Sequence, residues 1–312
     1  MTWGPPVATD GGGTGARSFR SGIVAVVGRP NVGKSTLVNA LVGTKVSIVS
    51  NKPQTTRFAV RGVLHGDGYQ VVFTDTPGYH KPSSPLGQRL NARVDDSVSG
   101  VDVVLLVVDA SGGGVGRGDA FVAEREVRGF GGTKVCAVNK VDRLQRRDVV
   151  PQLAAAAALA DFDHVVPLSA KTAAGIGELR DVLVEALPEG PALYPADAST
   201  DLALETRLAE VVREKALALT REEVPHSIAV DVESFERDDV TGFVTLSCSV
   251  LVERDSQKGI VIGKGGRMLR EIGTRARLEL ERMLGARVFL DLRVRVLKDW
   301  QRDPRALDRL GL

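Results

Sequence analysis

The chain has 312 residues and a formal net charge of +2, with 43% hydrophobic residues, 26% charged residues and two cysteines. This length exceeds one ordinary core and predicts two domains, and the composition is typical of a soluble globular protein. The longest strongly apolar run, Val103–Val108, falls short of the roughly 20 residues that span a bilayer. Cys136 and Cys248 lie far apart in strand-like runs, which argues against a disulfide framework and favours a reducing compartment.

The first half alternates strand-like and helix-length segments after a Gly-rich stretch, residues 1–20, that we expect to be disordered. This alternation predicts an open, mostly parallel sheet with helices on both faces, which is an α/β fold. Only four residues, His65–Gly68, join the second and third runs, so one strand must be antiparallel. The expected strands are Ile23–Val27, Ala59–Leu64, Tyr69–Asp75, Val101–Asp109, Lys134–Val138 and His164–Leu168.

A GxxxxGK[ST] sequence lies between the first strand and a helix-like segment. In this strand–loop–helix context the pattern predicts a phosphate-binding loop, because its backbone N–H groups and the helix N-terminus converge on one anion site. We expect Lys34 to contact the β- and γ-phosphates and Ser35 to ligate Mg²⁺. The loop residues expected to bind nucleotide are Gly28, Arg29, Pro30, Asn31, Val32, Gly33, Lys34, Ser35 and Thr36. Asn31 either helps to hold K⁺ or only stabilises the turn.

Two further loops are expected to sense the γ-phosphate. Asp75 ends a strand and is predicted to hold Mg²⁺ through water, while Gly78 lets a backbone N–H approach the γ-phosphate. Either Thr55 or Thr56 in the PQTTR loop completes the metal coordination, and the sequence leaves that choice open. We assign catalysis to Lys34, Thr55, Thr56, Asp75 and Gly78. The nucleotide site also takes Thr76, Pro77 and Tyr79, and the absence of a nearby glutamine there predicts slow intrinsic hydrolysis.

The base is predicted from two turns at later strand ends. In the NKVD sequence, Asp142 is placed to accept hydrogen bonds from the ring N–H and the exocyclic amine of guanine, which adenine does not offer. Five motifs follow one another along the chain, each at a strand end: the phosphate loop, the threonine loop, DTPG, NKVD and SAK. Together they predict binding of GTP and GDP rather than adenine nucleotides. The residues expected at the base are Asn139, Lys140, Asp142, Ser169, Ala170 and Lys171.

The second half follows a stretch with three prolines, Leu187–Pro195, which predicts a stiff linker. We expect a GTPase domain at 21–188, a linker at 189–200 and a second domain at 201–312. The second domain reads α-β-β-α-α-β with a GKGG turn between its last two helices, which predicts an α+β type II KH domain that binds single-stranded RNA. Basic residues concentrate there, although a solvated helix face gives a similar pattern. The RNA-binding set is Lys258, Ile262, Gly263, Lys264, Gly265, Gly266, Arg267 and Arg270. We expect the tail from Trp300 to Leu310 to pack on its own domain.

From Gly22 to Leu312 the chain resembles the bacterial Era GTPases, through GRPNVGKS, PQTTR, DTPGYHKP, NKVD, LSAKT, LPEGP, VIGKGG and the tail. The resemblance implies binding to the 3′ end of 16S ribosomal RNA, a role in maturation of the 30S subunit, a cytoplasmic location and some peripheral association with the membrane. A monomer is expected. We further expect GTP to order the loops and the linker to reposition the KH domain. The alternatives are a GTPase acting on another RNA such as transfer RNA, and an RNA-binding switch that nucleotide stabilises without turnover.

Overall fold

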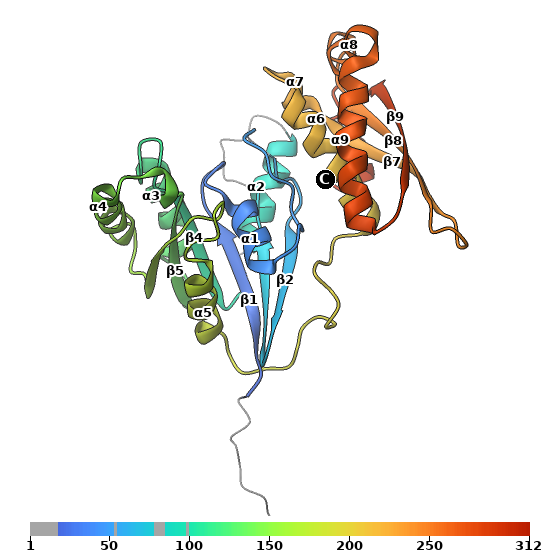
Figure 1. Cartoon of the computed structure of the whole chain (residues 1–312). Helices are drawn as coiled ribbons and strands as arrows, with labels where there is room; N and C mark the ends of the chain where they lie inside the picture. The colour runs from blue at the N-terminus through green and yellow to red at the C-terminus, as the bar shows by residue number, and fades with distance from the viewer. Residues whose placement is uncertain (1–17, 53–54, 78–84, 98–99) are drawn as a thin grey trace, which may run out of the picture.

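The computed structural model describes residues 18–52, 55–77, 85–97 and 100–312, and Figure 1 shows two domains joined by an extended segment. The first domain holds a six-stranded sheet of order β2-β3-β1-β4-β5-β6. Only β2 is antiparallel to its neighbour, because the turn between β2 and β3 is short. The strands are β1 (Arg20–Val27), β2 (Val60–Gly66), β3 (Tyr69–Asp75), β4 (Val103–Asp109), β5 (Thr133–Asn139) and β6 (His164–Pro167).

Helices cover both faces of this sheet. One core contains Leu37 of α1 and Leu179 of α5, and the other contains Val122 of α3 and Ala156 of α4. The central strand β4 is rich in valine and almost fully buried, as expected for a parallel sheet covered on both faces. The predicted α/β architecture is therefore confirmed. The helices are α1 (Lys34–Val42), α2 (Pro85–Ser97), α3 (Arg117–Val122), α4 (Arg146–Ala157) and α5 (Ile176–Ala186), with a π-helical turn at Ala123–Val127 and a 3₁₀ turn at Val141–Arg143.

The second domain packs three helices on a three-stranded sheet of order β7-β8-β9, in which β8 and β9 are parallel. Its element order matches the predicted α-β-β-α-α-β arrangement, with one additional helical turn, α7, before the first strand. The elements are α6 (Leu204–Leu219), α7 (Val224–Ser227), β7 (Ala229–Arg237), β8 (Val244–Val252), α8 (Asp255–Ile262), α9 (Arg267–Leu284), β9 (Val288–Val296) and α10 (Pro304–Arg309), and the GKGG turn is a 3₁₀ turn at Lys264–Gly266.

The linker lies along the edge of the first sheet (Figure 1). The Val63 N–H of β2 donates to the carbonyl of Ser199 at 2.9 Å, and the Gln70 side chain donates to the Tyr194 carbonyl at 2.8 Å. The Gln70 amide oxygen also accepts from two linker N–H groups. These contacts anchor the prolines to the GTPase domain.

The C-terminal tail joins the two domains, which corrects the expectation that it packs on its own domain alone. Trp300 is fully buried in a cluster that includes Leu86 and Leu90 of α2, and its indole N–H donates to the Ser227 carbonyl at 2.9 Å. The Leu86 N–H donates to the Gln301 carbonyl. The tail has apolar partners in α2 because α2 presents two leucines that the first core does not cover.

Candidate nucleotide and RNA sites

The phosphate loop follows β1 and opens directly into α1, as predicted. Gly28 and Gly33 have φ of 151° and 105°, and a Cβ at either position would lie 2.4 Å from an atom of Val107 or Asn139. Only glycine therefore fits at these two positions. The loop N–H groups and the N-terminus of α1 face one cavity of about 440 Å³.

Lys34 is held inside this loop. Its ammonium donates to the carbonyls of Gly28 and Arg29, at 2.9 and 3.0 Å. Burial lowers the pKa of Lys34 to about 8, against the opposing charge of Asp75. The arrangement holds the ammonium group ready for an anion, whose charge would offset the cost of its burial.

The two candidate metal-ligating threonines differ in position. The Thr56 hydroxyl lies 3.0 Å from the Ser35 hydroxyl, whereas the Thr55 hydroxyl donates to the Lys52 carbonyl at 2.5 Å. The side chain of Thr55 therefore closes its own loop. Of the two threonines, Thr56 is the one whose hydroxyl lies beside that of Ser35.

Asp75 ends β3 beside these hydroxyls and is fully buried. Within the described residues, neither of its carboxylate oxygens has a hydrogen-bond partner. Burial raises the pKa of Asp75, while Ser35, Lys34 and Ser47 act in the opposite direction. A buried carboxylate and two hydroxyls are oxygen ligands of the kind that Mg²⁺ prefers, so these residues fit that ion.

The base-binding turns meet at Asn139. Its amide donates to the Val32 carbonyl at 2.8 Å, and its amide oxygen accepts from the Ala170 N–H at 3.0 Å. Lys140 joins the same network, because its ammonium donates to the Asn31 carbonyl and to the Asp109 carboxylate. The sequence analysis missed Asp109, although this residue ends its strand in the same way as Asp75 does. One side chain thus ties the phosphate loop to both base-binding turns.

Most of the predicted nucleotide residues line this one cavity. Arg29 instead pairs with Asp119 at 2.7 Å, Val32 is buried, and the Thr76 hydroxyl donates to the Val26 carbonyl at 2.9 Å. Gly78 and Tyr79 lie outside the described residues. The predicted residues that line the cavity are Pro30, Asn31, Gly33, Lys34, Ser35, Thr36, Thr55, Thr56, Asn139, Lys140, Asp142, Ser169, Ala170 and Lys171.

The GKGG turn projects from the second domain between α8 and α9. Gly263, Gly265 and Gly266 all have positive φ, and a Cβ on Gly263 would lie 2.7 Å from the Met268 side chain. Lys264, Arg267 and Arg270 are exposed beside the turn, while Ile262 packs against the core and Lys258 is half-buried. The turn therefore presents backbone and charge to solvent.

A groove of about 460 Å³ runs from this turn between α9 and β9. Of the predicted RNA-binding residues, Gly266 and Arg270 line it. The sequence reading missed Phe289, which is 56% exposed, although an aromatic residue on the polar face of an alternating strand was the available signal. Aromatic side chains in such a position can stack on bases. The full lining is Gly266, Leu269, Arg270, Gly273, Thr274, Arg277, Phe289, Leu290 and Leu292.

Both halves of the chain match models of known protein families. Residues 23–140 match the family model of a 50S ribosome-binding GTPase, and residues 223–301 match that of a KH domain. GTPase Era of Mycobacterium sp. (strain KMS) is 50% identical over 297 residues, and GTPase Era of Mycobacterium tuberculosis (strain ATCC 25177 / H37Ra) is 48% identical over 301. Each alignment covers 94% of this chain and 99% of the relative.

Two solved structures share the whole architecture, each with a TM-score of 0.90, 40% identity and coverage of 94% of this chain and 99% of the other. One is Era in complex with MgGDPNP and nucleotides 1506–1542 of 16S ribosomal RNA, and the other is an Aquifex aeolicus Era variant bound to GDP and AlF₄⁻. The two-domain fold, the order of the motifs and the identity along nearly the whole length agree. This chain therefore belongs to the family of Era GTPases.

Proposed function

We propose that the protein is a GTP-hydrolysing switch that binds the 3′ end of small-subunit ribosomal RNA and acts in 30S subunit assembly. The observation that carries this proposal is the presence, in one chain, of a phosphate loop joined to base-binding turns and a GKGG turn that opens into a groove lined by Arg270 and Phe289. The relative solved with MgGDPNP and 16S RNA supports it. The GTPase domain at 21–188, the linker at 189–200 and the KH domain at 201–312 are the units that we propose.

For the nucleotide, the residues have separate roles. Lys34 and the loop N–H groups bind the phosphates, and Asp142 accepts from guanine. Magnesium, when bound, supplies positive charge that offsets the charge developing on the phosphates. Ser35, Asp75 and Thr56 would hold it, with Thr56 preferred to Thr55 because only Thr56 lies beside the Ser35 hydroxyl. The roles of Gly78 and Tyr79 stay predictions.

Coupling between the domains is proposed to run through the PQTTR loop rather than through the linker. The linker is anchored to β2 and β3, so its movement alone would break several hydrogen bonds. Arg213 of α6 donates to the Thr55 carbonyl, and the Arg57 guanidinium donates to the Ile228 carbonyl at 2.7 Å. The residue between Thr55 and Arg57 is Thr56, so a metal-dependent shift there would reach the KH domain directly.

The decisive experiment crosslinks the purified protein to ribosomal RNA in the presence of GDP or a non-hydrolysable GTP analogue, followed by sequencing of the bound RNA. We expect recovery of the 3′ end of 16S RNA and a difference in affinity between the nucleotide states. By linkage, RNA must then change the affinity for GTP by the same factor. Recovery of transfer RNA, or no multiple-turnover hydrolysis of GTP, would contradict the proposal.

Four expectations stay predictions: a cytoplasmic location, peripheral membrane association, a monomeric state and a K⁺ ion near Asn31. In the structure the Asn31 side chain donates to the Asn51 carbonyl at 3.1 Å, which gives it a role in the loop. Among the helices that the structure describes, none is long and apolar enough to cross a bilayer.

A further inference from the structure

A cavity of about 370 Å³ lies between the two domains, and the proposed function does not use it. Its wall on the GTPase domain is the loop after α1, residues 44–48, together with residues just before and at the start of β2. Its wall on the KH domain is one face of α6 and one face of α9, because the lining residues recur at helical spacing, 207, 210 and 211 on α6 and 279, 282 and 283 on α9. Pockets of roughly 300–1,000 Å³ at domain interfaces are common sites for small molecules.

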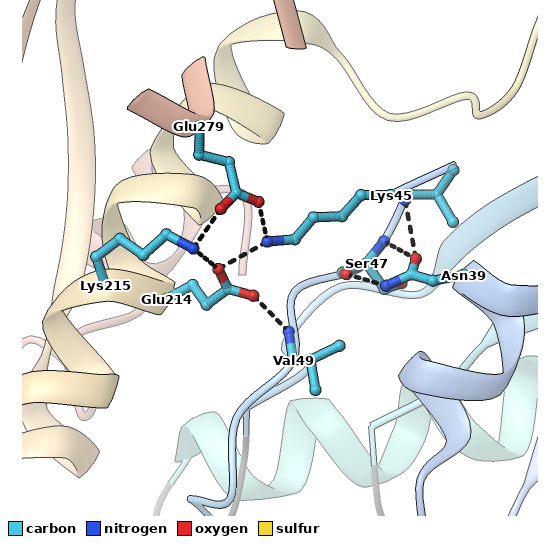
Figure 2. Close-up of polar contacts among 8 residues, drawn as sticks. Asn39, Lys45, Ser47, Val49, Glu214, Lys215 and Glu279 are labelled. Carbon is cyan, nitrogen blue, oxygen red and sulfur yellow. Dashed lines mark hydrogen bonds and ion pairs between the residues drawn. The ribbon is translucent and has the colours of Figure 1, made fainter. Parts of the chain in front are cut away.

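The loop that forms the first wall is held from both domains (Figure 2). From α1, the Asn39 amide oxygen accepts from the N–H groups of Val46 and Ser47, both at 2.9 Å. The Asn39 amide donates to the Ser47 carbonyl at 2.7 Å. From the KH domain, Glu214 of α6 accepts from the Val49 N–H at 2.9 Å. The cavity is therefore bounded by a backbone whose position is fixed by several hydrogen bonds.

The carboxylates that line the cavity already have cations of their own. Glu279 of α9 pairs with Lys45, which also contacts Glu214 at 2.7 Å. Figure 2 shows that a second ammonium group completes this cluster of two acids and two cations. The Glu210 carboxylate accepts from Nε and Nη2 of Arg213, at 2.6 and 2.7 Å. None of these acidic groups is left to pair with another cation at the cavity.

Two arginines of the lining remain. Arg207 of α6 is half-buried and Arg282 of α9 is exposed, and within the described residues neither guanidinium takes part in an ion pair. The same lining contains the apolar side chains of Val46, Phe58 and Met283. The cavity thus combines apolar surface with two positive charges that no carboxylate of the described residues neutralises. Guanidinium groups bind carboxylate and phosphate groups through paired hydrogen bonds, so a ligand that fits both features is an anion with an apolar body.

We propose that this interdomain cavity is a binding site for a small amphipathic organic anion. Its apolar body lies against Phe58 and Met283, and its carboxylate, sulfonate or phosphate group accepts hydrogen bonds from Arg207 and Arg282. Because the walls come from both domains, such a ligand favours the domain arrangement that the structure shows.

The site also adjoins the nucleotide cavity. Ile48 and Thr56 line both cavities, so the two share part of a wall. Any effect of the ligand on nucleotide affinity must be matched by an equal effect of nucleotide on the ligand.

The test titrates the full chain with anilinonaphthalene sulfonate, an aromatic body that carries one sulfonate, by isothermal titration calorimetry. Saturating GDP and Mg²⁺ keep the probe out of the nucleotide cavity. We expect saturable binding, which Arg207→Gln combined with Arg282→Gln weakens at least about 10-fold through the loss of hydrogen bonds to a charged group. Octanoate, which has an apolar chain and a carboxylate, should compete with the probe. Inorganic phosphate, which has no apolar body, should not.

Two further variants separate the cavity from the rest of the surface. Arg302→Gln combined with Arg305→Gln removes the same two charges from exposed positions of the tail outside the cavity lining, and no change is expected. Met283→Trp puts a larger side chain into the cavity and should abolish binding while both cavity arginines stay in place. A urea titration confirms that each variant is folded. Arg282→Gln alone, at an exposed position, replaces the double variant if that variant is not.

Three outcomes would overturn the inference. They are the absence of saturable binding, an unchanged affinity when the two cavity arginines are replaced, and an equal loss of affinity in the tail variant. Displacement of the probe by inorganic phosphate would mean that charge alone is recognised, and the assignment to an amphipathic anion would then be wrong.

Discussion

Asp142 concentrates the choice of base in one exposed carboxylate at the rim of the nucleotide cavity. Replacing it by Asn turns an acceptor of two guanine donors into a group that offers one acceptor and one donor. We expect Asp142→Asn to weaken GDP binding by about 100-fold, from the loss of charged hydrogen bonds, and to favour xanthosine diphosphate. Competition between the two nucleotides measures this. Asp148→Asn, an exposed carboxylate of α4 outside the cavity lining, should change nothing, and guanine selectivity that survives in Asp142→Asn would contradict the assignment.

The two cysteines report separately on the two domains. Cys136 lies in β5 and Cys248 in β8, and burial raises the pKa of each thiol to about 12. At pH 8 roughly 10⁻⁴ of each would be thiolate, so we expect alkylation by iodoacetamide to require opening of the domain. Mass spectrometry of each peptide gives the two rates. GDP with Mg²⁺ should slow labelling of Cys136 more than that of Cys248. Rapid labelling of native protein would contradict the burial of these thiols.

Among the elements, local patterns predicted the strands to within a few residues. Continuous apolar runs in the first domain and alternating apolar residues in the second are both visible in the sequence. The glycines of the phosphate loop and of the GKGG turn were also predictable, because each belongs to a short motif that is visible in the sequence. Contacts between distant segments were not. Nothing near Thr55 in the sequence indicates that its carbonyl meets Arg213, and nothing near Trp300 indicates the leucines of α2. Phe289 and Ser47 carry no motif, so their places emerge only when the chain is folded.

Arg57 is the element-scale link between the PQTTR loop and the KH domain. Its guanidinium is 2% exposed, donates to the Ile228 and His226 carbonyls, and lies 5.2 Å from the Trp300 ring centroid. Arg57→Gln removes the charge and part of this fork. We expect the difference in RNA affinity between the GTP-analogue and GDP states to shrink several-fold. The affinity for nucleotide measured without RNA should stay near that of the wild type.

The matched control for Arg57→Gln is Arg61→Gln. Arg61 contacts the linker, through Tyr194 at 3.1 Å and Asp201 at 3.6 Å, and is about half-exposed. If coupling runs through the loop, Arg61→Gln leaves the RNA affinity difference intact. If Arg61→Gln abolishes that difference and Arg57→Gln does not, the linker is the path and our assignment is wrong.

At the scale of the whole molecule, the contacts between the domains differ in kind among the residues that the structure describes. The tail cluster is apolar, the Arg57 and Arg213 contacts are buried and polar, and the Lys45 contacts are ionic. Between them remains a cavity of about 370 Å³, lined by Phe58, Arg207 and Met283 among others. An interface that is not packed throughout is compatible with relative movement of the domains. The apolar cluster is then the part that keeps them together.

Trp300 tests that role. It is fully buried, and its indole N–H bonds to Ser227 while its ring lies in the cluster with Leu86 and Leu90. Trp300→Ala should lower the free energy of unfolding by about 3–5 kcal/mol, because a large buried ring leaves a cavity. Trp300→Phe keeps much of the apolar surface and should cost less. Urea titrations followed by circular dichroism measure both, with Val240→Ala, at a side chain that is 94% exposed, as the control. The cluster spans both domains, so we expect Trp300→Ala to let them unfold separately. The urea concentration at which alkylation is half complete should then differ between Cys136 and Cys248. If the two cysteines keep one common midpoint at the wild-type urea concentration, the tail does not join the domains.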